Sequence, residues 1–145
     1  MNRLEQIKAD PFQQSFYSVL RYLERNSPGK PRIGDSVTTS DDVVTLSQDP
    51  YTAFPSSNLS GVDKTANGVL RLQLKFLGMF GPHGALPLHV TETTQIWDVR
   101  DPSFRHFVDI FSTRFQQLFY RAWADARPIA QFERPKEDRF QVYLG

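Results

Sequence analysis

The sequence predicts an α+β fold, in which amphipathic helices pack with a small β element and are joined by long, irregular, proline-rich connections. Three observations support this fold class. Apolar residues recur at three- and four-residue spacing near residues 11–25 and again near 102–126, and they alternate with polar residues near 69–77. The chain has 145 residues, which is enough for one modest domain with its own core.

The first amphipathic helix is expected from about residue 11 to 25. Asp10-Pro11 has the N-cap and first-turn residues that favour a helix start. Asn26-Ser27-Pro28-Gly29 is a stop signal. The apolar stripe of this helix consists of Phe12, Phe16, Val19, Leu20 and Leu23, and Arg21, Glu24 and Arg25 lie off the stripe.

The segment from Lys30 to about Gly68 is expected to be mostly irregular. Val43 to Leu46 fits a short strand, but no strand or helix pattern emerges between Tyr51 and Asn67. The main strand follows near 69–77, where Leu70, Leu72, Leu74 and Phe76 alternate with Arg71, Gln73 and Lys75. A turn-rich stretch from Gly78 to Pro87 ends this part of the chain.

Two further helices are expected, near 88–99 and near 102–126, with Asp101-Pro102 between them. The second is the longest of the chain, and Pro128 marks its end. Its apolar positions lie on one face: Phe104, Phe107, Val108, Phe111, Phe115, Leu118, Phe119, Ala122 and Trp123. One short helix is expected near 137–144.

Composition narrows the classes of function. Lys and Arg total 17 against 16 Asp and Glu, so the chain lacks the cationic excess of nucleic-acid binders. The absence of cysteine excludes disulfides, thiolate catalysis and cysteine-bound metal. With no apolar run of membrane-spanning length and no signal-peptide core, the sequence predicts a soluble, cytoplasmic protein.

Candidate chemical sites are sparse. The pairs His89 with Glu92 and His106 with Asp109 can each share a helix face, but a metal site needs three or four ligands and no third ligand is evident. Gly78, Gly81 and Gly84 lie between a strand and a helix, as in a phosphate-binding loop, but they match neither standard glycine motif. A tight structural turn is the alternative, and we expect no catalytic residue, cofactor or metal.

The long helix has more apolar surface than the rest of the chain offers to cover. Burying one large apolar side chain stabilises by about 1.5–3 kcal/mol, yet the available counter-surface is one shorter helix and one or two strands. Two stretches near 26–42 and 47–68 are also long for structureless connections in a compact domain. Either these parts fold over their own core or a neighbouring chain completes them, and both interpretations remain open.

Several segments in order resemble the TssG family of type VI secretion baseplate proteins, also called ImpH or VasB. They are Pro31-Arg32-Ile33-Gly34, Gln48-Asp49-Pro50, Phe54-Pro55, the run from Phe76 to His89, Phe107 to Phe111, and Phe119 to Trp123. Met79-Phe80 departs from the two leucines expected there. The resemblance implies that residues 1–127 form the N-terminal domain of a longer protein and that 128–145 begin a C-terminal extension or linker.

The resemblance also implies a non-enzymatic wedge subunit of a contractile, phage-tail-like machine. Its implied partners are TssF, TssE and TssK in a hetero-oligomeric complex, without nucleic acid or membrane insertion, in a cytoplasmic baseplate docked at the inner-membrane complex. A stand-alone binding module, or a small metal- or phosphate-binding enzyme domain, is the alternative. The expected partner-binding residues are Gly81, Pro82, His83, Leu86, Pro87, His89, Phe107, Phe111, Phe115 and Trp123.

Overall fold

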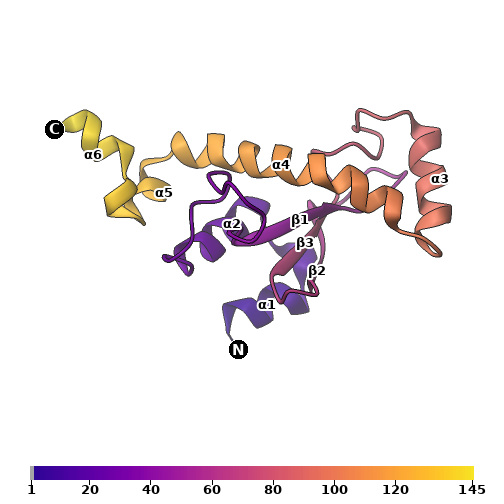
Figure 1. Cartoon of the computed structure of the whole chain (residues 1–145), viewed down its shortest axis with the longest axis horizontal. Helices are drawn as coiled ribbons and strands as arrows, with labels where there is room; N and C mark the ends of the chain where they lie inside the picture. The colour runs from indigo at the N-terminus through magenta and orange to yellow at the C-terminus, as the bar shows by residue number, and fades with distance from the viewer. Residues whose placement is uncertain (1) are drawn as a thin grey trace.

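The helix α4 (Ser103–Asp125) runs along one side of the molecule in the computed structural model, which describes residues 2–145. The helix α3 (Leu88–Asp98) lies at one end of α4, and α5 (Pro128–Phe132) and α6 (Arg139–Leu144) lie at the other (Figure 1). The sheet, α1 (Arg3–Ala9) and α2 (Phe16–Arg25) lie on one side of α4. These helices confirm the α+β class and the predicted helices near 88–99 and 102–126.

The sheet has three strands in the order β1-β3-β2: β1 (Val44–Gln48), β2 (Leu59–Lys64) and β3 (Leu70–Leu74). The central strand β3 is parallel to β1 and antiparallel to β2. It is the strand predicted near 69–77, but it ends at Leu74. Leu77 has a φ of 47°, a left-handed conformation that no regular strand continues through.

The prediction that no strand lies between Tyr51 and Asn67 was wrong, because β2 occupies Leu59–Lys64. Its sequence, LSGVDK, lacks the alternation of apolar and polar residues that predicts a strand. Only Leu59 is buried, and the register shifts between Leu59 and Gly61. Cross-strand pairing with β3 supports this strand. Arg71 donates from Nε and Nη2 to the two carboxylate oxygens of Asp63, both at 2.8 Å.

The predicted helix over residues 11–25 is interrupted. Pro11–Gln13 form a single 3₁₀ turn, and α2 begins only at Phe16. The Asp10 carboxylate accepts a hydrogen bond from the Gln13 side chain at 2.7 Å and caps no helix amide, so the expected N-cap is missing. Phe12 is consequently 58% exposed, whereas Phe16 and the rest of the stripe are buried as expected.

The core lies between α1, α2 and the sheet. Its apolar members come mostly from these elements, and α4 contributes only Tyr120 and Ala124 to the cluster. The members are Ile7, Phe16, Val19, Leu20, Leu23, Ile33, Val44, Leu46, Leu59, Leu72, Leu74, Tyr120, Ala124 and Ala130. Within the part of the chain that the structure describes, no helix combines the length and apolarity needed to cross a membrane.

Candidate interaction surface

The helix α4 turns its polar side toward the core. Its buried residues are Val108, Ser112, Gln116, Gln117, Tyr120, Arg121 and Ala124, of which only Val108 and Ala124 are aliphatic. An ordinary surface helix buries its apolar face and exposes its polar one. We call this buried side the inner face of α4.

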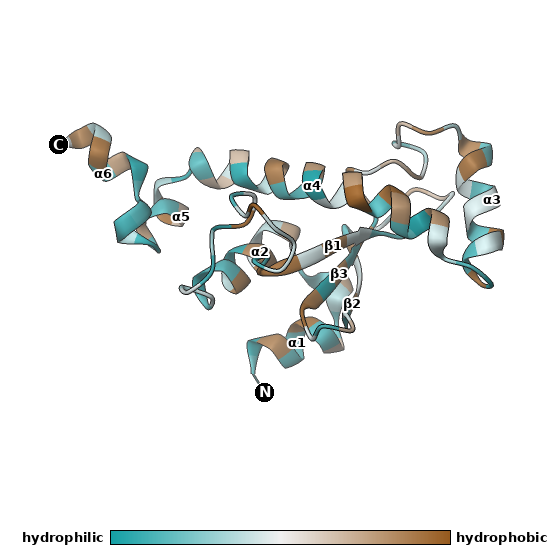
Figure 2. Ribbon diagram, in the orientation of Figure 1, coloured by the Kyte–Doolittle hydropathy of each residue, from teal (hydrophilic) through white to brown (hydrophobic). Residues whose placement is uncertain are grey.

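The opposite side of α4 is apolar and exposed. Seven large apolar residues on it are 40–66% exposed: Phe104, Phe107, Ile110, Phe111, Phe115, Leu118 and Phe119. We call these seven residues the outer face of α4; hydrophobic bands recur along the helix in Figure 2. Of the nine predicted apolar positions only Val108 is buried, so the helix packs on its own chain through its other side. A contiguous exposed apolar patch of this kind marks an interaction site.

A buried polar cluster holds the inner face in place. Glu24 of α2, predicted to lie off the buried stripe, is only 4% exposed. Its carboxylate accepts hydrogen bonds from the Ile33 amide at 2.9 Å, from Arg121 Nη1 at 3.1 Å and from the Tyr120 hydroxyl at 3.2 Å. Burial, followed by the negative charge of Glu24, raises the pKa of Tyr120, so that its hydroxyl remains a donor.

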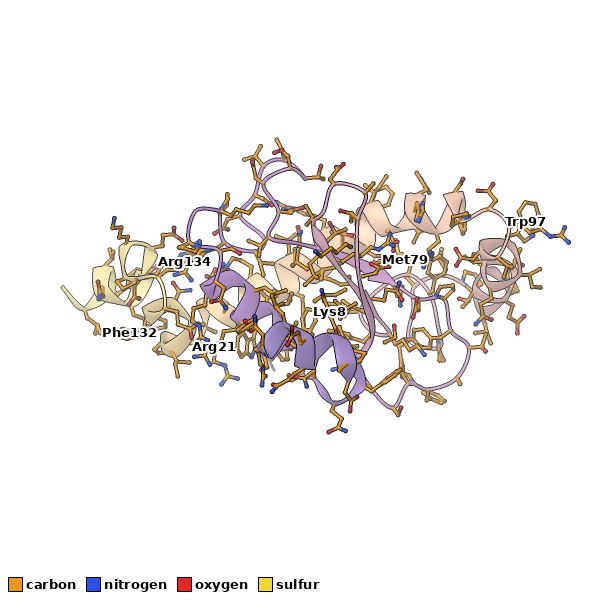
Figure 3. All side chains as sticks on the ribbon, turned by 90° about the horizontal axis from the view of Figure 1, so that it is seen from below. Lys8, Arg21, Met79, Trp97, Phe132 and Arg134 are labelled. Atoms are coloured by element: carbon orange, nitrogen blue, oxygen red, sulfur yellow. The ribbon has the colours of Figure 1, made fainter. Side chains whose placement is uncertain are left out.

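Two further buried arginines join the C-terminal helices to this cluster. Arg134 donates to the carbonyl oxygens of Ser27, Lys30 and Glu24 at 2.7, 2.8 and 2.9 Å. Arg32 donates to the carboxylate of Glu137 at 2.9 Å. Arg21 and Arg134 both lie where α2 meets the C-terminal helices (Figure 3).

Gly34 allows the segment before β1 to touch α4. Its φ is +95°, and a Cβ placed there would be 2.9 Å from the Cβ of Arg121 and 3.1 Å from the carbonyl oxygen of Gln117. Glycine alone combines this conformation with so close an approach. The Pro31–Gly34 motif therefore has a packing role on the inner face.

The end of β1 is joined to α4 by Asp109. Its carboxylate accepts from the Ser47 hydroxyl at 2.5 Å and from the Gln48 amide at 3.0 Å. Burial raises the pKa of Asp109, although both hydrogen bonds act in the opposite direction. Farther along α4, the Gln116 side chain donates to the carbonyl oxygen of Phe76 at 3.1 Å.

The Gly-Pro loop after β3 is fixed by the buried side chain of Gln48. Its amide donates to the Phe80 carbonyl and its oxygen accepts from the Phe80 amide, both at 2.9 Å. Gly81 has a φ of +90°, and an added Cβ would be 2.7 Å from the Tyr51 ring. Its amide donates to the Thr91 hydroxyl at 3.1 Å.

These contacts favour the structural turn over the phosphate-binding loop. The amides of Phe80, Gly81, Gly84 and Leu86 are all bonded within the chain, to Gln48, Thr91, Gly81 and Met79. A phosphate-binding loop presents free amides to its ligand. The structure therefore supports a rigid turn. Among the residues described, no group of three or more His, Cys, Asp or Glu is placed to hold a metal ion.

The expected partner-binding residues do not form one continuous site. Gly81 is buried, Pro82 and Leu86 are half-buried, and His83, Pro87 and His89 are exposed. The exposed ring of His83 lies 5.2 Å from that of Phe54. A groove of about 580 Å³ brings His89 together with Trp97 and Phe104, between α3 and the start of α4.

Phe107, Phe111 and Phe115 lie on the outer face, whereas Trp123 is half-buried near the other end of α4. Trp123 stacks on Tyr17 with a centroid separation of 4.6 Å. Sequence reasoning missed Glu24, Arg32, Gln48 and Arg134. Their partners are distant along the chain, 97 residues for Glu24 with Arg121, so no local pattern identifies them.

Comparison with known proteins identifies a matching family. The model of the family described as "Type VI secretion, TssG" matches residues 10–145. Neither the curated proteins nor the solved structures include a match.

Proposed function

Because this chain belongs to the TssG family of type VI secretion proteins, we propose that it is a non-enzymatic, structural subunit of the baseplate wedge. In this role it scaffolds assembly of the contractile tail through protein–protein contacts. The proposed partners are TssF, TssE and TssK in a hetero-oligomeric complex. The proposed location is the cytoplasm, in a baseplate docked at the inner-membrane complex.

The outer face of α4 is the observation that carries this proposal. Aromatic side chains dominate the binding energy of protein interfaces, because each buries a large area at a small cost in side-chain entropy. Five of the seven outer-face residues are phenylalanines, and each of the seven is at least 40% exposed. Covering this row with a partner supplies apolar contact that the chain's own core does not provide.

The Gly-Pro loop supplies a second, smaller contact in this proposal. Its backbone is rigid because Gln48 and Thr91 hold it, while His83, Pro87 and His89 remain exposed on its surface. A preformed loop loses little conformational entropy when a partner binds. We assign the partner-binding surfaces to residues 1–127, and we propose that residues 128–145, which pack on the same core through Ala130 and Arg134, are a C-terminal extension.

The test replaces three phenylalanines of the outer face by serine, Phe107→Ser, Phe111→Ser and Phe115→Ser together. We expect the helical circular dichroism spectrum and a cooperative melt to persist, because these side chains are exposed. Co-purification with co-expressed TssF is expected to fall at least tenfold, as hot-spot losses of this kind do.

The matched control replaces three apolar residues that are at least as exposed but lie elsewhere, Val37→Ser, Val142→Ser and Leu144→Ser. It should retain full yield of the complex. The proposal would be contradicted if the α4 triple variant retained the full yield of the complex with TssF, or if the control lost as much of that yield.

A further inference from the structure

A groove at the C-terminal end of α4 combines arginines with aromatic rings. It measures about 670 Å³ and is lined by side chains of α1, α2 and α4 that include Arg3, Tyr17, Arg21, Tyr22, Arg25 and Trp123. We call it the arginine–aromatic groove. The Arg127 guanidinium lies 5.4 Å from the centre of the Trp123 ring and adds a further positive charge beside it.

Two arginines that line the groove already bind one carboxylate of their own chain. Arg21 donates to Glu133 from Nε at 3.0 Å to both oxygens and from Nη2 at 2.7 Å, and Arg25 Nη1 lies 3.7 Å from the same carboxylate. The hydrogen bonds to Glu133 are the largest cause of the raised pKa of Arg21. The guanidinium groups of these arginines are thus oriented to bind carboxylates.

The remaining positive charge of the groove is not matched within the chain. Among residues 2–145, Arg3 and Arg127 form no ion pair with a carboxylate, and Arg3 donates only to the Ser18 hydroxyl at 3.2 Å. The Arg25 side chain is 55% exposed. After Glu133 neutralises one guanidinium, positive charge remains beside the aromatic rings.

The groove is continuous with the outer face of α4. The ring of Phe119, an outer-face residue, lies 6.1 Å from that of Tyr17, and Tyr17 stacks on Trp123 at 4.6 Å. A polypeptide that covers the apolar row therefore reaches the arginines without leaving the aromatic surface.

We propose that the arginine–aromatic groove docks an acidic segment of a partner polypeptide, with Glu or Asp side chains bound by Arg3, Arg25 and Arg127 and apolar side chains on Tyr17 and Trp123. This inference rests on the proposed function, since the same partner covers the outer face. Charge complementarity of this kind fixes the register of an interface and accelerates association.

A single-stranded nucleic acid is the competing ligand, because arginines and stacked aromatics also bind bases and phosphates. Two observations favour the acidic polypeptide. The formal net charge of the chain is only +1, and the groove adjoins an apolar row that a polyanion does not cover.

The first experiment uses the full chain with Trp97→Phe, so that Trp123 is its only tryptophan. The probes are a synthetic peptide that alternates Glu with Leu and Phe, the same peptide with Lys in place of Glu, and a single-stranded oligonucleotide of equal charge. We expect the Glu peptide alone to shift the fluorescence of Trp123, with an affinity that falls as salt rises. Tighter binding of the oligonucleotide, or equal binding of both peptides, would overturn the proposal.

The second experiment reverses the charge of Arg3, Arg25 and Arg127 to Glu and leaves Arg21 with its structural partner Glu133. The control reverses three exposed lysines outside the groove, Lys8, Lys64 and Lys136, and so changes the net charge equally. The control should melt like the parent, and the groove variant should melt cooperatively at a slightly lower temperature, because Arg25→Glu places a second carboxylate beside Glu133. The groove variant is expected to bind the Glu peptide and co-expressed TssF at least tenfold more weakly, while the control changes either affinity less than about twofold.

The outcomes separate this inference from the proposed function. If the groove variant retains TssF while the Phe107, Phe111 and Phe115 variant loses it, the groove proposal fails and the scaffold proposal stands. Equal weakening by the lysine control also overturns the groove proposal, because the effect is then one of net charge. If both the groove variant and the phenylalanine variant retain TssF, both proposals fail.

Discussion

The inner and outer faces of α4 are made of opposite kinds of side chain and perform different tasks. The inner face is held by directional contacts from Gln116, Tyr120 and Arg121 to distant segments, whereas the outer face carries a row of exposed phenylalanines. A buried polar contact fixes one geometry, because a misplaced donor or acceptor is left unpaired. An apolar surface tolerates many partners of suitable shape. The contrast indicates that directional bonding positions the helix and leaves its apolar side for assembly.

The largest expected effect comes from breaking the inner-face cluster with Glu24→Ala. This change leaves the Arg121 guanidinium, whose side chain is 7% exposed, without its closest buried carboxylate. Removing one partner of a buried ion pair costs about 3–5 kcal/mol, and we expect a loss of this size in urea unfolding at neutral pH. Glu92→Ala, at an exposed position on α3, should change the free energy of unfolding by less than about 0.5 kcal/mol. Equal effects of the two changes would show that the cluster does not hold the helix.

A smaller loss is expected where the Pro31–Gly34 segment contacts the inner face. Gly34→Ala introduces a Cβ 2.9 Å from that of Arg121 at a φ of +95° and should reduce stability by about 1–3 kcal/mol. The control, Gly29→Ala, meets no atom within 4 Å and has no left-handed backbone, so its melting temperature should stay the same or rise slightly. A melt of Gly34→Ala unchanged from the parent would contradict the close packing of this segment.

The buried contact between Asp109 and the end of β1 predicts that the free energy of unfolding depends on pH. Its folded-state pKa is raised above the ordinary value of 3.8, so the folded protein holds this proton more tightly than the unfolded chain. Protonated Asp109 therefore stabilises the folded protein at low pH, and this stabilisation is lost as pH rises through the folded-state pKa.

The measurement compares the free energy of unfolding of the parent and of Asp109→Asn across acidic and neutral pH. Because asparagine does not titrate, the variant should gain stability relative to the parent as pH increases through that window. A difference that stays constant with pH would contradict the assigned direction. Asp101→Asn is the matched control, because Asp101 is exposed and the direction of its pKa shift is the opposite.

The smallest expected effect is on the outer face. Phe111→Ser in the isolated chain should change the free energy of unfolding by less than about 1 kcal/mol, because that side chain is already 47% exposed. For comparison, Leu46→Ala, at a fully buried position of β1, is expected to lose about 2–5 kcal/mol. A loss for Phe111→Ser as large as that for Leu46→Ala would mean that the outer face is part of the core.

The local pattern of apolar residues was sufficient to predict those elements in which the pattern repeats over several residues. Five turns of regular spacing gave α4 to within a residue at each end, and the alternation from Leu70 to Leu74 gave the central strand. It failed for β2, where Gly61 and Asp63 mask the alternation, and at Asp10, whose carboxylate bonds to Gln13 and not to a helix amide.

For the candidate site, the sequence identified the apolar row on α4 and the Gly-Pro turn, because each depends on residues that are close along the chain. The tertiary structure alone decided which side of α4 is buried, since that depends on the contacts of Arg121, Asp109 and Gln116 with segments that no local pattern connects to them. The sequence by itself determined that this chain has a long helix with one apolar face. That the face points outward follows only from the fold, because the chain's own sheet and helices bond to the polar side of α4.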